Sequence, residues 1–319
     1  MPASPLRSPF NLDPDLIPMA VTLPTQTIDL SCGPVAYRRG GSGSPLILIH
    51  GWRGTSNHWQ ETLSSLADLR EVHALDLPGH GDTPPRQDPL TPEGLAALTL
   101  EYADRAGLDE FDLMGHSFGV VVAINLASRQ PRRVRRLVLS SMGLVRNDLE
   151  HYALLHTHSA WNLALSWWRP WLMLTRPWAG MGWPWQDWLS ANPMLSSAIA
   201  APFLRQWPLD PSLVREGVRD FLATDPLSAL EIAISANSAR FKAAIAGVHA
   251  PVLLLSGDRD PIAPVSAVEA LARRLSDCRT VFLKDCGHLP MVEWPEVFHV
   301  QVRNFLEAEE AFSVGGRPA

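Results

Sequence analysis

Ser117 combines a nucleophilic hydroxyl with a sequence setting that exposes it. It is the central residue of Gly115-His116-Ser117-Phe118-Gly119, between the mostly apolar runs 110–114 and 120–128. This order predicts a strand, a sharp turn and a helix, and glycines on both sides allow a tight turn without steric collision. At the start of a helix, free amide N–H groups and the helix dipole favour negative charge. An attacking hydroxyl and a developing oxyanion need that environment.

A serine hydroxyl is a weak nucleophile unless a base and an orienting carboxylate accompany it. Asp260 follows the aliphatic run 252–256, and His288 follows the run 280–283. In a parallel sheet, residues that follow strands gather at the carboxyl ends of those strands. The spacing therefore makes His288 the candidate base and Asp260 the candidate carboxylate. Asp258 is a rival carboxylate, although it is better suited to capping its own loop.

Strands and helices alternate over most of the chain, as in an α/β fold with a mostly parallel central sheet flanked by helices. After a hairpin over 27–38, we expect strands at 45–49, 71–77, 111–114, 134–140, 252–256 and 280–283, and helices at 56–69, 91–107, 118–129, 265–275 and 295–309. The alternation stops between residues 145 and 248, where only helical patterns and nine of the 12 tryptophans occur. We expect an N-terminal arm (1–24), a core (25–144 and 249–312), an all-helical tryptophan-rich insertion (145–248) and a disordered tail (313–319).

Composition excludes several classes of partner. The 319 residues carry a net charge of −6 and show no basic stripe, so we expect no nucleic acid partner. The three cysteines lack metal-ligand spacing and cannot all pair, and the N-terminus has no continuous apolar segment, so we expect a cytoplasmic protein. His151, His156 and His158 do not share one helical face, so we expect no metal site there.

Four motifs resemble those of the α/β-hydrolase superfamily, in its serine-nucleophile, esterase-like and lipase-like branch with a helical cap, and they follow one another along the chain in the superfamily's order. They are His50-Gly51-Trp52, the loop 76–82, Gly115 to Gly119, and the pair of loops around Asp260 and His288. The resemblance covers 27–144 and 249–310. It implies that Ser117 is the nucleophile, His288 the general acid/base and Asp260 the orienting acid, with no cofactor.

The resemblance also implies an oxyanion hole formed by the backbone N–H groups of Trp52 and Phe118. Some relatives take the acid from the strand after the nucleophile, which makes Asp148 a further alternative. The insertion falls where the superfamily carries a cap over the active site. We expect the substrate pocket to be lined by residues from both parts, with these candidates: His50, Gly51, His116, Trp161, Trp168 and Leu289.

These observations predict a serine hydrolase that acts on a small, uncharged, hydrophobic carboxylic ester. Two alternatives remain open: a carbon-carbon bond hydrolase of ring-cleavage products, and a non-catalytic binding or accessory protein for a hydrophobic ligand. Prolines and arginines interrupt the tryptophan-rich run, so we expect no transmembrane helix, but weak contact of the cap with a membrane surface is compatible with its tryptophans. The oligomeric state is left open by the sequence.

Overall fold

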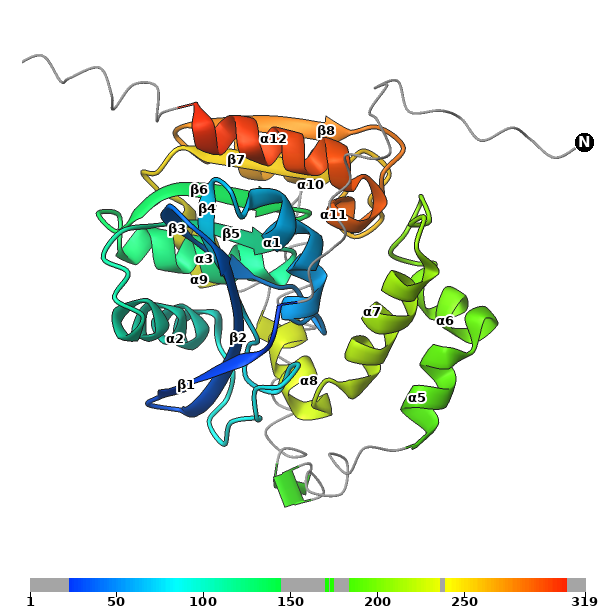
Figure 1. Cartoon of the computed structure of the whole chain (residues 1–319). Coiled ribbons are helices and arrows are strands. Elements are labelled where there is room, and N and C mark those ends of the chain that lie inside the picture. The colour runs from blue at the N-terminus through cyan, green and yellow to red at the C-terminus, as the bar shows by residue number, and fades with distance from the viewer. Residues whose placement is uncertain (1–22, 145–169, 172, 175–183, 236–238, 309–319) are drawn as a thin grey trace, which may run out of the picture.

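A mixed sheet of eight strands forms the centre of the protein (Figure 1). The computed structural model describes residues 23–144, 170–171, 173–174, 184–235 and 239–308. The strands, in chain order, are β1 (Gln26–Leu30), β2 (Gly33–Gly41), β3 (Ser44–Ile49), β4 (Arg70–Leu75), β5 (Phe111–His116), β6 (Val134–Ser140), β7 (Val252–Gly257) and β8 (Cys278–Leu283).

The spatial order of the strands is β1-β2-β4-β3-β5-β6-β7-β8. The predicted hairpin forms an antiparallel edge, since β2 pairs antiparallel with both β1 and β4. All remaining pairs are parallel. Parallel strands are usually covered by helices on both faces, and β3 has this character, since Leu46 to Ile49 are fully buried. The α/β class expected from the sequence is confirmed.

Helices cover both faces of the sheet. One face packs against α2 (Pro92–Arg105), α3 (Phe118–Arg129) and α10 (Val265–Ala272), through residues such as Leu95, Val121 and Leu271. The other packs against α1 (Gln60–Leu66) and α12 (Pro295–Glu307), through residues such as Leu63 and Phe298. The short helices η2 (Ser56–Trp59) and α11 (Pro290–Glu293) precede α1 and α12 respectively.

Within the described part of 145–248 every regular element is a helix: α5 (Pro184–Ala191), α6 (Pro193–Ala200), α7 (Pro211–Ala223), α8 (Pro226–Ser235) and α9 (Ala239–Ile245). Helices α6 and α7 begin with proline after the side-chain caps Asn192 and Asp210, which favours their starting points. Helices α5, α6 and α7 stand together away from the sheet (Figure 1).

Helix α9 packs differently from the rest of the insertion. Phe241 and Ile245 are buried in the same cluster as Val120 of α3, so α9 packs against α3 and belongs to the core rather than to the cap. The expected insertion extends to residue 248, whereas the chain has already returned to the core at α9. The expected arm lies mostly, and the expected tail entirely, outside the described residues. In the part of the chain that the structure describes, no helix combines the length and the apolar character needed to cross a bilayer.

Candidate active site

Ser117 lies between β5 and α3 with φ of 50° and ψ of −117°, in a region that non-glycine residues rarely occupy. Its N–H donates to the carbonyl of Ser140 on the neighbouring strand at 2.8 Å. The two glycines permit this turn. A Cβ on Gly115 would lie 2.4 Å from the carbonyl oxygen of Gly119, and a Cβ on Gly119 would lie 2.2 Å from the carbonyl oxygen of Ile49. Glycine therefore lets helix and strand approach closely enough to hold the serine in a strained turn.

The three residues singled out by spacing meet in one hydrogen-bonded chain. The Ser117 Oγ lies 3.0 Å from Nε2 of His288, and Nδ1 of His288 lies 2.8 Å from Oδ2 of Asp260. Asp260 and His288 are buried, each with 4% of its surface exposed. A carboxylate only accepts hydrogen bonds, so Nδ1 carries the imidazole proton and Nε2 presents a lone pair to the serine hydroxyl. This tautomer is the one a general base needs.

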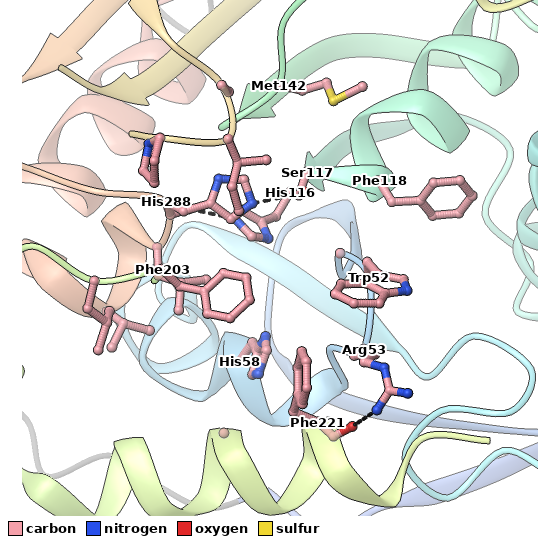
Figure 2. A pocket seen from close by; sticks show the side chains of 18 of the residues that line it. Trp52, Arg53, His58, His116, Ser117, Phe118, Met142, Phe203, Phe221 and His288 are labelled. Atoms are coloured by element: carbon pink, nitrogen blue, oxygen red, sulfur yellow. Dashed lines mark hydrogen bonds between the residues drawn. The ribbon is translucent and has the colours of Figure 1, made fainter. Parts of the chain in front are cut away.

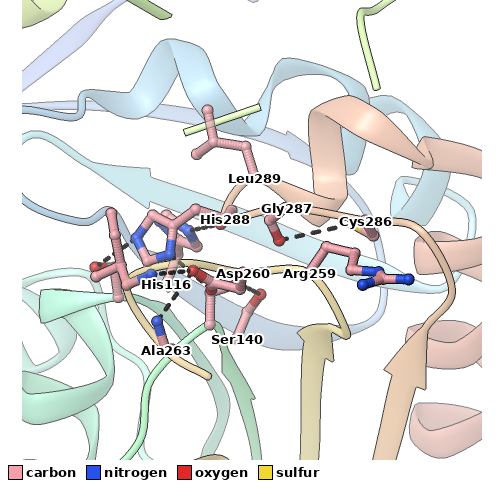
Figure 3. A network of polar contacts seen from close by, with 12 residues as sticks. His116, Ser140, Arg259, Asp260, Ala263, Cys286, Gly287, His288 and Leu289 are labelled. Carbon is pink, nitrogen blue, oxygen red and sulfur yellow. Dashed lines mark hydrogen bonds and ion pairs between the residues drawn. The ribbon is translucent and has the colours of Figure 1, made fainter. Parts of the chain in front are cut away.

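Asp260 is fixed by its own loop (Figure 3). Its Oδ1 accepts hydrogen bonds from the amides of Ile262 and Ala263 at 2.8 and 3.0 Å. Burial alone would raise the pKa of this carboxyl, but the hydrogen bond and charge of His288 and these two amides outweigh it and leave the pKa below its ordinary value. The rival Asp258 makes no hydrogen bond to His288, and its buried Oδ1 has no partner in the described part of the chain.

His116 supports the loop that carries His288. Its Nε2 lies 2.9 Å from the carbonyl oxygen of His288, so Nε2 bears the proton and donates it there. Burial and then the neighbouring imidazole of His288 lower the pKa of His116 to about 3. His116 therefore stays neutral at physiological pH and keeps this tautomer.

Phe118 follows Ser117 directly, and Gly51, the residue before Trp52, lies so close that a Cβ there would be 3.0 Å from the Cβ of Ser117. Neither the amide of Trp52 nor that of Phe118 donates to another group in the described residues. The N–H of Phe118 is one of the free donors at the start of α3. The indole of Trp52 does not point into the turn, because its Nε1 donates to the carbonyl of Ala229 on α8 at 2.8 Å. Two free amides beside a serine hydroxyl suit the stabilisation of an oxyanion.

A cavity of about 890 Å³ opens beside Ser117 and His288 (Figure 2). The core supplies residues beside the serine and along the loop before α10, and the cap supplies apolar side chains of α6 and α7 together with the segment between them. The wall includes Gly51, Trp52, His116, Met142, Leu144, Ile199, Phe203, Leu204, Leu213, Val214, Val218, Phe221, Ile262 and Leu289. Arg53 is the single Asp, Glu, Lys or Arg among the described lining residues.

Gly51, His116 and Leu289 line the cavity as expected, but His50 does not. The imidazole of His50 is fully buried: Nε2 accepts the N–H of Leu77 at 3.0 Å, and Nδ1 lies 2.8 Å from the carbonyl oxygen of Gly51. Burial, followed by the charge of His80, lowers the pKa of His50 well below its ordinary value. His50 thus joins two loops and offers nothing to a substrate. Trp161, Trp168, Asp148 and the three histidines at 151–158 lie outside the described residues.

Three residues near the site escaped the sequence interpretation. His58 lines the cavity opposite Ser117 (Figure 2), and burial lowers its pKa. Asp220 of α7 accepts hydrogen bonds from Thr55 and Asn57 at 2.6 and 2.9 Å, which ties the cap to the loop after Trp52. Glu293 accepts four backbone N–H groups around His288. Of the three, only Glu293 stands out in the sequence, because it is an acidic residue within the apolar run 289–295.

Among the described residues, no group of three or more His, Cys, Asp or Glu side chains could hold a metal ion. The three cysteines are all free thiols. Among the described residues, Ser117 is the one hydroxyl that hydrogen bonds link through a histidine to a carboxylate.

Several known proteins resemble this chain over most of its length. A pimeloyl-[acyl-carrier protein] methyl ester esterase of Nitrosomonas europaea is 30% identical over 265 residues, which cover 81% of this chain and 94% of the relative. A dihydrolipoyllysine-residue acetyltransferase component of an acetoin cleaving system from Pseudomonas putida is 29% identical over 278 residues, or 84% of this chain and 64% of the relative.

Among solved structures, a membrane phospholipase A described as a bacterial virulence factor superposes with a TM-score of 0.68 at 25% identity. The match covers 90% of this chain and 86% of the other. Residues 46–300 match the profile of the Alpha/beta hydrolase family, which spans both core segments and the insertion between them. Since the profile covers most of the chain and the fold agrees, this protein belongs to the Alpha/beta hydrolase family.

Proposed function

We propose that this protein is a serine hydrolase that cleaves an uncharged, hydrophobic carboxylic ester through an acyl-enzyme. The observation that carries the proposal is the hydrogen-bonded chain from Ser117 through His288 to Asp260, which borders a largely apolar cavity. In this proposal Ser117 is the nucleophile, His288 the general acid/base and Asp260 the orienting acid.

Acylation starts when the Ser117 Oγ attacks the ester carbonyl carbon and Nε2 of His288 takes the hydroxyl proton. The carbonyl oxygen becomes an oxyanion, which the amides of Trp52 and Phe118 stabilise. Asp260 stabilises the imidazolium and keeps its ring oriented. The tetrahedral intermediate then collapses, the ester C–O bond breaks, and the imidazolium gives its proton to the departing alkoxide. The products are an alcohol and an ester between Ser117 and the acyl group.

Deacylation repeats these steps with water as the nucleophile. His288 removes a proton from a water molecule that attacks the acyl carbon, and the same two amides hold the second oxyanion. The proton then returns to the Ser117 oxygen as the carboxylic acid leaves. The cycle consumes one ester and one water and needs no cofactor.

The cavity favours a hydrophobic acyl group. About 890 Å³ is within the range of pockets that bind drug-sized molecules, and its wall is mostly aliphatic and aromatic. Arg53, the one charged lining residue, donates to the carbonyl of Phe221 at 2.7 Å and stacks against that ring, with 4.8 Å between its Cζ and the ring centroid. The Nitrosomonas relative is named for a methyl ester of an acyl chain on a carrier protein, which agrees with an ester substrate.

Hydrolysis of p-nitrophenyl esters from two to sixteen carbons tests the proposal. We expect one preferred chain length, and a loss of kcat of at least about 1000-fold in both Ser117→Ala and His288→Ala. Ser128→Ala is the matched control, because Ser128 lies at the far end of α3 and bonds the carbonyl of Asn125. Undiminished hydrolysis by Ser117→Ala would refute the mechanism. Tight binding of an ester without turnover by the wild type would favour a binding protein instead.

A further inference from the structure

Glu293 connects the loop that carries His288 with segment 203–206 of the cap. Its side chain, at the end of α11, is buried with 6% of its surface exposed. Its Oε1 accepts the N–H of Leu289 at 3.1 Å, and its Oε2 accepts the N–H of Gly287 at 2.9 Å. The carboxylate thus binds the residues immediately before and after His288.

The same carboxylate also binds the cap. Oε2 accepts the N–H groups of Arg205 and Gln206 at 2.8 and 2.9 Å. A direct bond adds to this bridge, because the N–H of His288 donates to the carbonyl of Phe203 at 2.8 Å. The segment 203–206 therefore lies against the histidine loop along its whole length.

Two further observations concern the fit of this contact and the charge at its centre. A Cβ on Gly287 would lie 2.7 Å from the carbonyl oxygen of Phe203 and 2.8 Å from Oε1 of Glu293, so only glycine fits there. Glu293 also has no ion-pair partner among the described residues, so amide dipoles alone compensate its buried charge. Hydrogen bonds from N–H groups to an ionised acceptor are shorter and stronger than neutral ones, and an ionised carboxylate has room for four of them.

We propose that Glu293 is a positioning residue that sets the placement of His288 and the docking of cap segment 203–206 together. Phe203 and Leu204 of that segment line the cavity, and the Phe203 ring centroid lies 6.4 Å from that of His288. One carboxylate thus aligns the base with Ser117 and fixes the inner wall against which the acyl group packs. The inference rests on the proposed function for its kinetic consequences and on the hydrogen bonds alone for its structural ones.

Glu293→Gln is the sharpest test, because it keeps the size of the side chain but replaces one acceptor oxygen with an NH2 group that faces amide donors. We expect kcat for p-nitrophenyl esters to fall about 10- to 100-fold, as misplacement of a catalytic group by about 1 Å does. Glu293→Asp keeps the charge on a shorter side chain and should recover part of the loss. Glu296→Gln, an exposed glutamate on the next helix, is the matched control and should keep wild-type kinetics.

Val302→Ala separates positioning from stability, because Val302 is fully buried in α12 and lies in the same core cluster without forming a hydrogen bond to the histidine loop. We expect it to lower Tm while kcat, measured well below Tm, stays near that of the wild type. If Glu293→Gln lowers only Tm, as Val302→Ala does, then Glu293 is a structural residue and the inference is wrong.

Hydrogen exchange tests the inference without any substrate. In Glu293→Gln we expect faster amide exchange in peptides covering 203–206 and 286–289 together, and no change at either segment in Glu296→Gln. Faster exchange at one segment alone, or at neither, would overturn the link between loop and cap. If Glu293→Gln shows this exchange pattern but the wild type hydrolyses no ester, the proposed function is refuted and the role of Glu293 stands.

Discussion

Burial of histidines makes the stability of this protein depend on pH, and His299 allows the effect to be measured one residue at a time. His299 lies on α12, buried against α1, where Nε2 is 3.0 Å from Oγ1 of Thr62 and Nδ1 is 3.2 Å from Oγ of Ser65. Burial lowers the pKa of His299 to about 4, against about 6.5 in an unfolded chain. As pH falls below 6.5, protons bind the unfolded chain before the folded one, so stability is lost until pH reaches about 4.

The magnitude follows from these two pKa values. Lowering the pH from 7 to 5 costs about 2 kcal/mol of unfolding free energy through His299 alone, because the unfolded imidazole is almost fully protonated at pH 5 and the folded one almost neutral. His73 and His80 act in the same direction, since burial lowers the pKa of each to about 4. A typical domain is stable by about 5–15 kcal/mol, so the loss is a large part of the total.

Urea unfolding at pH 7 and pH 5 measures the effect. We expect His299→Gln to reduce the difference in unfolding free energy between the two pH values by about 2 kcal/mol relative to the wild type. His249→Gln is the control, because the imidazole of His249 is exposed and remains in water when the chain folds. If His299→Gln and the wild type lose the same free energy between pH 7 and pH 5, the reasoning from burial is refuted.

Three further predictions concern the site. Gly119→Ala should abolish ester hydrolysis and lower Tm in a thermal melt, because the new Cβ would lie 2.2 Å from the carbonyl oxygen of Ile49; wild-type activity would contradict the steric argument. Gly217→Leu should lower kcat/KM for dodecanoate esters relative to acetate esters, because Gly217 lines the cavity and the nearest atom to its Cβ position is 3.9 Å away; an unchanged ratio would exclude this wall from the acyl site. Asp220→Ala should cost about 1–3 kcal/mol in urea unfolding by leaving the side chains of Thr55 and Asn57 without their acceptor, and equal stability would show that this contact is not needed.

The sequence was sufficient to predict the core and the meeting of Ser117, Asp260 and His288. Buried parallel strands leave continuous aliphatic runs, and the residues that follow them must gather at one edge of the sheet. The predicted strand 134–140 and helix 118–129 agree with the structure residue by residue. The glycines around Ser117 were informative because only glycine fits a helix and a strand that approach so closely.

Glu293 and Asp220 could not be predicted in the same way. Glu293 accepts hydrogen bonds from backbone amides, and every residue except proline carries such an amide, so no partner is visible in the sequence. Asp220 meets Thr55 and Asn57 only because α7 docks on η2, a contact between segments more than 160 residues apart. His50 was misassigned for a related reason, since its position beside Gly51 says nothing of the Leu77 amide that it binds.

The roles of the cap tryptophans and the location of the protein in the cell remain predictions. Trp171 and Trp188 are more than half exposed, at 56% and 62%, so the described part of the insertion does not bury them against the core. The sequence predicted a cytoplasmic location and was compatible with weak contact of the cap with a membrane surface. Flotation of the protein with lipid vesicles tests for this membrane contact.

Labelling with a fluorophosphonate, followed by mass spectrometry of the intact chain and of its peptides, tests the central claim most directly. An activated Ser117 predicts one adduct per chain on the peptide containing Ser117, no adduct in Ser117→Ala, and much slower labelling in His288→Ala. An adduct on another residue, or labelling of Ser117→Ala at the wild-type rate, would contradict the assignment of Ser117 as the nucleophile.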